Sequence, residues 1–339
     1  MKTLFATTFT AILLAGCSGT GQDASNSAAA NSATANSVDT ASLPFEAGQP
    51  LGVTTDGKFT PMSDNVKVYG AVVSAESCSY DATRDLIMVI NRGAAQKEAP
   101  NDGFVSLMNH DGSIHTTRWI GMNRNGLVLN QPFGSDVHDG KLYLADSDGD
   151  TADGAERVSV LRMFDIKTGA PAGEVKVPES QWFNDIAVAK DGTVYASQTG
   201  NTEGTTPQRI FKVTPDGKAS IFIDGAPLSR PNGVAMDNDG NIVVLNMGND
   251  EVLTFSPDGK LAKTEKAAQA GNDGLVILKD GTKYVSSVMN GGISRIRPNQ
   301  PAELIATGIP SAASMCYDEG ANQLVIPMNP NNSVAIVKL

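Results

Sequence analysis

The chain has 339 residues, of which 40% are hydrophobic and only 19% are charged, with 34 glycines and a net charge of −11. This length and apolar content suffice for a large core, and the many glycines with few helical patterns favour an all-β protein. The acidic balance leaves no basic surface for nucleic acid. All three histidines, His110, His115 and His138, fall near expected hairpin tips, so a histidine-rich zinc site is not expected.

The first element is an N-terminal targeting signal. Lys2 precedes an apolar run from Leu4 to Leu14, which is typical of a signal peptide and too short for an ordinary membrane-spanning helix. The run ends in "LAGC", which resembles the lipobox of bacterial lipoproteins; the resemblance implies cleavage before Cys17 and lipidation of its sulfur. Ser18 resembles the outer-membrane pattern, so we expect a lipid-anchored protein of the cell envelope, on the outer membrane and facing the periplasm. The alternative is an ordinary secreted protein with a chance cysteine.

A polar segment follows the signal. From Ser18 to Ser42 it is rich in Ala, Ser, Asn and Thr and contains no aromatic residue. Such a segment cannot bury enough apolar surface to offset the entropy lost on ordering. We therefore predict three parts: a lipoprotein signal peptide at residues 1–16, the lipidated cysteine with a flexible linker at residues 17–43, and a folded domain at residues 44–339.

The folded domain is built from a repeat. Asp-Gly dipeptides follow short apolar runs at residues 139–140, 191–192, 239–240 and 280–281, in steps of 52, 48 and 41 residues. A second series of tips lies between them, so each repeat holds two hairpins and hence four strands. Six such units can be counted, and this period predicts an all-β, six-bladed β-propeller. Val66–Ser74 precedes the first full unit and is expected to complete the last blade, which would close the ring.

Oxygen-bearing side chains occur where four of the innermost strands begin. They are Glu76 in blade one, Asn184 in blade three, Asn232 in blade four and Asp273 in blade five. Because every innermost strand runs along the central channel, these side chains should converge at one channel mouth. Amide and carboxylate oxygens suit a hard divalent cation, and Ca²⁺ is expected because it accepts many oxygen ligands in loose geometry. The alternative is that Asn and Asp before Gly are only turn formers.

The same stretches resemble the family of gluconolactonases, senescence marker protein and luciferin-regenerating enzyme, whose members are six-bladed propellers with one divalent metal in the channel. "RPNGVAMDNDG" resembles the family's Pro-Asn-Gly stretch, which implies that Asn232 is a metal ligand. "NDGLVILKDG" places the family's ligand and proposed general base on Asp273, and "AESCSYDATRDLIMVI" places its glutamate ligand on Glu76. "WFNDIAVAKDG" implies that Asn184 lines the site.

Two departures from the family pattern bear on specificity. The Gly-Pro after the ligand glutamate is Ser77-Cys78 here, and the family's substrate-binding arginine is replaced by Trp182. Arginine holds oxygen-rich ligands through a fixed set of donors, whereas tryptophan offers one donor and an apolar face. The departures favour a non-catalytic propeller lipoprotein that binds a protein or a small ligand at the cell envelope.

The pairing of an amide with a carboxylate favours an enzyme instead. In that interpretation the protein is a metal-dependent hydrolase of a lactone or related ester. Glu76, Asn232 and Asp273 hold the metal, and Asp273 supplies the nucleophile directly or through a water. Asn184 and Trp182 orient the substrate.

Two cysteines of the folded domain lie far apart in the sequence. Cys78 and Cys316 fall on the innermost strands of the first and last blades, which are neighbours in a closed ring. A disulfide needs Cα atoms within about 7 Å, and neighbouring blades can be farther apart than that. We therefore expect two buried free thiols, with a bridge, which an oxidising periplasm permits, as the alternative.

An acidic run from Asp146 to Glu156 has the composition of a calcium-binding loop but not its spacing. Counted from Asp146, the position that requires glycine is Thr151, and the last ligand position is Arg157. We expect an acidic insertion between two strands, with a surface calcium site as the alternative.

Overall fold

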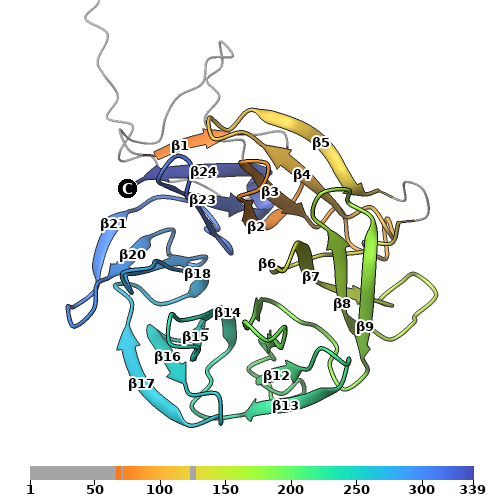
Figure 1. The fold of residues 1–339 in the computed structure, drawn as a ribbon. Helices are drawn as coiled ribbons and strands as arrows, with labels where there is room; N and C mark the ends of the chain where they lie inside the picture. Colours follow the sequence, from red (N-terminus) through yellow and green to blue (C-terminus); the bar gives the residue numbers. More distant parts are fainter. Residues whose placement is uncertain (1–65, 70–71, 123–126) are drawn as a thin grey trace, which may run out of the picture. The chain divides into compact units, whose positions relative to one another are not determined.

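A computed structural model of the chain describes residues 66–69, 72–122 and 127–339, all within a unit spanning Asp39–Leu339. The predicted signal peptide, the lipidation site at Cys17 and the linker lie outside these residues. The described part forms six four-stranded antiparallel sheets arranged around a central axis (Figure 1). The prediction of an all-β, six-bladed propeller is therefore confirmed. In the same residues, no helix has the length and apolar character needed to cross a membrane.

Within each blade, the four strands are given in order from the channel to the rim. Blade one holds β2 (Ala75–Asp81), β3 (Leu86–Asn91), β4 (Phe104–Met108) and β5 (Ile114–Gly121), and blade two holds β6 (Ser135–His138), β7 (Lys141–Asp148), β8 (Val158–Asp165) and β9 (Pro171–Val177). Blade three holds β10 (Ile186–Val188), β11 (Val194–Gln198), β12 (Arg209–Val213) and β13 (Ala219–Asp224), and blade four holds β14 (Pro231–Met236), β15 (Ile242–Asn246), β16 (Glu251–Phe255) and β17 (Leu261–Lys266). Blade five holds β18 (Asn272–Ile277), β19 (Lys283–Ser287), β20 (Ile293–Ile296) and β21 (Glu303–Ala306), and blade six holds β22 (Cys316–Asp318), β23 (Gln323–Met328), β24 (Ser333–Lys338) and β1 (Val66–Tyr69).

The ring closes through blade six, which joins the two ends of the propeller sequence. Its strand order is β1-β24-β23-β22, so β1, the first described strand, is the outermost strand and lies beside β24 (Figure 1). Val66 pairs with Val337 and Tyr69 with Val334. This pairing confirms that the segment before blade one completes the last blade, so both ends of the propeller sequence share one sheet.

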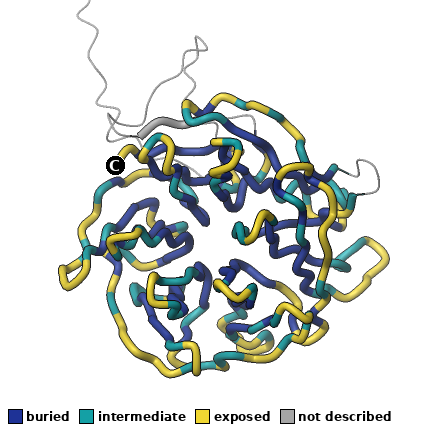
Figure 2. The backbone as a smooth tube through the Cα atoms, viewed as in Figure 1, coloured by how far each residue is buried: buried dark blue, intermediate teal, exposed yellow. Residues whose placement is uncertain are grey.

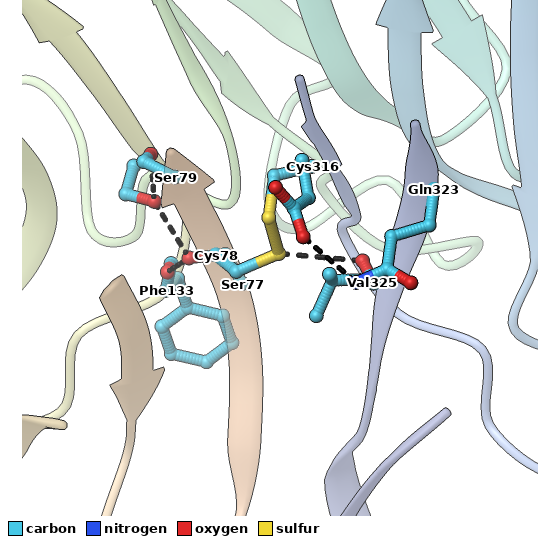
Figure 3. Close-up of a disulfide and its surroundings, with 9 residues drawn as sticks. Ser77, Cys78, Ser79, Phe133, Cys316, Gln323 and Val325 are labelled. Atoms are coloured by element: carbon cyan, nitrogen blue, oxygen red, sulfur yellow. Dashed lines mark hydrogen bonds between the residues drawn. A yellow bond between two sulfur atoms is a disulfide. The ribbon is translucent and has the colours of Figure 1, made fainter. Parts of the chain in front are cut away.

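A disulfide makes a second closure at the channel. Cys78 on β2 and Cys316 on β22 are bonded, with their Cα atoms 5.4 Å apart and 238 residues apart in sequence (Figure 3). The expectation of two free thiols is therefore wrong. Innermost strands converge on the propeller axis, and neighbouring blades come closest there, within the range that a disulfide spans.

The hydrophobic core lies between the faces of adjacent blades. One cluster joins Phe133, Tyr143, Phe183 and Phe211, which belong to blades two and three or to the loops leading into them. Figure 2 shows burial concentrated around the channel and exposure along the rim. The outermost strand β17 is mostly exposed, whereas β15 in the same blade is fully buried. The core thus fixes where each innermost strand begins around the channel mouth.

Candidate metal and substrate site

Three predicted site residues occupy β-bulges at the start of an innermost strand. The pairing register shifts around Glu76 in β2, around Asn232 in β14 and around Asp273 in β18. In the described ladders of the other three blades, innermost and second strands pair without such a shift. A bulge inserts an unpaired residue and turns its side chain out of the regular alternation. The three side chains are therefore presented at the same channel mouth.

The glycines after Asn232 and Asp273 are required by close packing. A Cβ at Gly233 would lie 2.1 Å from the carbonyl oxygen of Asp273, and a Cβ at Gly274 would lie 2.4 Å from the backbone nitrogen of Met315. Each glycine thus lets the next blade approach. Both dipeptides lie inside strands, so the alternative that they are turn formers is wrong.

Asn232 and Asp273 form a buried pair across two blades. Asn232 Nδ2 donates a hydrogen bond of 3.1 Å to Asp273 Oδ2, and the two residues are 2% and 5% exposed. Their other oxygens, Asn232 Oδ1 and Asp273 Oδ1, are buried and have no hydrogen-bond partner among the described residues. Leaving a buried polar atom without a partner costs about 1–3 kcal/mol. Two such oxygens on a hydrogen-bonded pair of side chains suit a cation ligated by oxygen.

Glu76 lies in the same region but has protein partners. Its Oε2 accepts a hydrogen bond from Asn329 Nδ2 and lies 3.4 Å from Arg92 Nη1. Ser74 Oγ donates to Asn329 Oδ1 over 2.9 Å, which holds the amide in place. The structure therefore brings Glu76 close enough to Asp273 to affect its pKa, while also giving Glu76 a cationic neighbour.

Negative charge accumulates in this region. Burial raises the pKa of Asp273 well above its usual range, and the charges of Glu76 and Asp185 raise it further. Burial also raises the pKa of Asp185 to about 7 and that of Asp136 to about 6. No three His, Cys, Asp or Glu side chains in the described ranges form a metal-binding group by themselves. A cation here would therefore depend on the amide oxygen of Asn232 as well as on carboxylates, and it would relieve their repulsion.

The two predicted substrate residues lie on the loop before β10. Asn184 is 8% exposed, and its backbone nitrogen donates to Ser197 O over 2.8 Å. Trp182 is 36% exposed and packs edge-to-face on Phe133, with ring centroids 4.8 Å apart. Trp182 thus offers an apolar surface beside the channel mouth.

A cavity of about 490 Å³ occupies the channel below these residues. It is lined by innermost strands, and its walls include the Cys78–Cys316 disulfide, Asp136 and Asp185. Along the strands the lining begins two residues after Glu76, Asn232 and Asp273. The candidate site therefore lies at one end of the channel cavity.

The acidic run at Asp146–Glu156 is a connection between strands, as predicted. It covers the end of β7 and the loop to β8. Asp146 pairs with Arg162 over 2.6 Å, and Asp150 pairs with Lys97 over 3.0 Å. These carboxylates are satisfied by protein cations rather than directed at a common point.

The sequence itself identifies a family. Residues 112–327 match the SMP-30/Gluconolactonase/LRE-like region. The chain belongs to this family. The match contains Asn184, Asn232 and Asp273 and begins after Glu76.

The fold of this SMP-30/gluconolactonase-like propeller is also found among solved structures. Virginiamycin B lyase from Staphylococcus aureus is similar with a TM-score of 0.56 at 13% identity, covering 81% of this chain and 99% of that one. A gluconolactonase from Xanthomonas campestris is similar with a TM-score of 0.55 at 15% identity, covering 88% and 97%. Among curated proteins, none matches this sequence. At these identities the likeness is one of fold.

Several residues of the mouth were not predicted in this SMP-30/gluconolactonase-like chain. Asp185 directly follows Asn184 and accepts the backbone N–H of Val234 in the next blade over 3.1 Å. Because Asp185 stands next to Asn184 at the start of an innermost strand, the sequence could have indicated that it belongs to the mouth. Arg92 follows β3 in a stretch without a motif, and the β2–β3 pairing places it at Glu76. Asn329 follows β23 of blade six, so only the packing of blades six and one places it there.

Proposed function

We propose that this protein is a metal-dependent hydrolase of a lactone or related ester. Glu76, Asn232 and Asp273 would hold one divalent cation, in our proposal Ca²⁺, at the channel mouth. The observation that carries the proposal is the pair of buried oxygens without partners, Asn232 Oδ1 and Asp273 Oδ1. Membership of the SMP-30/Gluconolactonase/LRE-like family supports it.

The chain's own residues suggest how the reaction would proceed. When bound, the cation would supply a Lewis acid that polarises the substrate carbonyl and stabilises the developing negative charge. Asn232 holds Asp273 Oδ2 and leaves Oδ1 for the cation, so the Asp273 carboxylate would accept the proton of a water that attacks beside the cation. Asn184 and Trp182 would orient the substrate, with the indole face against its apolar part.

We also propose that the protein works in the cell envelope. Cys17 would carry the lipid that anchors it, on the outer membrane and facing the periplasm. The Cys78–Cys316 disulfide supports an oxidising compartment, because structural disulfides persist where thiols are not kept reduced.

A second candidate function is a propeller that binds a ligand or protein without turning it over. The observation that favours it is the contact of Glu76 with Arg92 and Asn329, which compensates this carboxylate without a metal. In this case the channel mouth would be a binding surface, and Asp273 would have no catalytic role.

Metal analysis separates the two candidates. The full chain is stripped with chelator, reloaded with Ca²⁺ and dialysed, beside Asp273→Asn and the control Asp136→Asn, which removes a half-buried carboxylate that lines the channel cavity. We expect one bound Ca²⁺ in wild type and control and none in Asp273→Asn. A panel of lactones and aryl esters should then be cleaved by wild type, with chelator lowering the rate about 100-fold or more. Bound metal without turnover would favour the binding function, and absence of metal would refute the site.

A further inference from the structure

Two arginines flank an aromatic pair at the channel mouth. The Arg92 guanidinium lies 4.3 Å from the ring centre of Phe133, Phe133 packs on Trp182 at 4.8 Å, and the Arg157 guanidinium lies 5.1 Å from the ring of Trp182. These four residues, here called the arginine–aromatic cluster, come from the loops of blades one, two and three. Through Arg92 the cluster touches Glu76, so it adjoins the candidate metal site.

The position of Arg157 is fixed by neutral partners. Its Nε donates to Ser147 Oγ over 3.1 Å, and its Nη2 donates to Gln131 Oε1 over 2.5 Å. Gln131 is itself held, because its backbone N–H donates to Asp146 Oδ1 over 2.7 Å. No carboxylate of the described residues forms an ion pair with Arg157. An arginine oriented by hydrogen bonds but lacking a close counterion is suited to bind an anion.

The second arginine is only partly compensated. Arg92 Nε is buried without a hydrogen-bond partner among the described residues, and its contact with Glu76 is 3.4 Å long. Burial lowers the pKa of Arg157; Asp150 opposes this shift, and the charge of Arg92 adds to it. The two cations are thus near enough to repel each other. An anion bound beside the aromatic pair would reduce this repulsion.

We propose that the arginine–aromatic cluster is a binding subsite for an organic carboxylate, whose charge pairs with Arg92 and Arg157 and whose apolar body lies against Trp182. As a statement about substrates it rests on the proposed function: the ester or lactone would carry a carboxylate beside the bond that is cleaved. Glu76 contacts Arg92, and Asp150, although it makes no ion pair with Arg157, is near enough for its charge to act on it, so the subsite is suited to a monoanion rather than a dianion.

Binding of small probes tests the subsite without catalysis. Phenylacetate, its neutral analogue phenylacetamide, and phenyl phosphate are titrated calorimetrically into the full chain with chelator present, so that no metal contributes. We expect phenylacetate to bind at least about tenfold more tightly than either other probe. A charge-assisted hydrogen bond to a guanidinium is stronger than one from a neutral amide, and the charges of Glu76 and Asp150 disfavour the second charge of the phosphate. Arg157→Gln should lose this preference, and Arg157→Lys should keep part of it.

Arg84 provides a matched control. It stacks on Trp119 at 4.0 Å and pairs with Asp81, so it resembles Arg92 in its contacts, but it lies in the β2–β3 turn at the other end of blade one. Arg84→Gln should bind phenylacetate as wild type does. The proposal would be overturned if phenylacetate and phenylacetamide bind equally, if neither binds, or if phenyl phosphate binds more tightly. It would also be overturned if Arg84→Gln loses the preference for phenylacetate as much as Arg157→Gln does.

The outcome is separable from that for the hydrolase. Carboxylate-selective binding without Ca²⁺-dependent turnover would leave the subsite standing and refute the enzyme. Ca²⁺-dependent turnover of neutral and carboxylate-bearing esters with equal kcat/KM in wild type and Arg157→Gln would leave the enzyme standing and refute the subsite.

Discussion

Asn232 and Asp273, 41 residues apart in sequence, are joined by a 3.1 Å hydrogen bond from Nδ2 to Oδ2 across the boundary between blades four and five. The bond orients both groups so that one oxygen of each is buried and has no partner in the described structure. Both residues stand on bulges, and each is followed by a glycine that a neighbouring blade packs against. This relationship links the repeat architecture to the proposed chemistry.

The close approach at Gly233 predicts a packing defect. Gly233→Ala would place a methyl group 2.1 Å from the Asp273 carbonyl, so backbone must shift. We expect a loss of roughly 2–4 kcal/mol in the free energy of unfolding, measured by urea titration, together with weaker metal binding. Gly240→Asn is the control, because that hairpin tip has open space and a φ of +83°, which asparagine tolerates. Equal stability of the two variants would show that the approach is not as close as described.

The disulfide predicts redox-dependent stability. Cys78 and Cys316 are 238 residues apart in sequence, and the loop-entropy relation assigns such a bridge about 5 kcal/mol. The double variant Cys78→Ser, Cys316→Ser should therefore unfold at clearly lower urea concentration than wild type. A reducing agent should lower the urea midpoint of wild type but leave that of the variant unchanged. Because β1 still pairs with β24, the variant should retain a β-type circular dichroism spectrum. Identical urea midpoints for wild type and variant would contradict the bridge.

His110 predicts a pH-dependent contribution to stability at the opposite face of the ring. Its Nδ1 lies 2.8 Å from Asp318 in blade six, and its Nε2 lies 3.1 Å from Asp85 in blade one. The hydrogen bond with Asp318 raises the pKa of His110 despite partial burial. A raised histidine pKa stabilises the folded state fully below about pH 6.5, and this contribution is lost as pH rises through the folded value.

We therefore expect the wild-type Tm to fall between pH 6 and pH 8.5 by more than that of His110→Asn. His115→Asn, at an exposed position on β5, serves as the control and should follow wild type. Parallel pH profiles for wild type and His110→Asn would mean that the histidine is not charged in this contact.

Asp136, a carboxylate of the channel, predicts a second dependence of stability on pH, at lower pH than that of His110. Burial raises the pKa of Asp136 to about 6, above the value of about 3.9 expected in the unfolded chain. The folded state then binds the proton more tightly, so stability decreases as pH rises from about 4 to 6. In metal-free protein, Asp136→Asn should flatten this slope, whatever its effect on absolute stability. An unchanged slope between these pH values would argue that Asp136 is ionised at its usual pKa.

Local signals made the propeller predictable. Asp-Gly tips, alternating apolar strands and their spacing recur because each blade obeys the same rules of turn chemistry and burial, so six blades could be counted without coordinates. The positions of Glu76, Asn232 and Asp273 followed from the same repeat, since equivalent positions in a ring face the same mouth. For the same reason Val66–Tyr69 could be assigned to blade six.

The sequence repeat did not predict how closely neighbouring blades approach each other. The Cys78–Cys316 bridge required knowing that innermost strands approach to 5.4 Å between Cα atoms, and the expectation from sequence was the opposite. Arg92, Phe133 and Arg157 carry no repeat signal, yet packing of three successive blades brings them to Glu76 and Trp182. Periodicity depends on neighbours along the chain, whereas the charges and apolar surfaces at the mouth depend on side chains that meet only when the strands have paired and the blades have packed together.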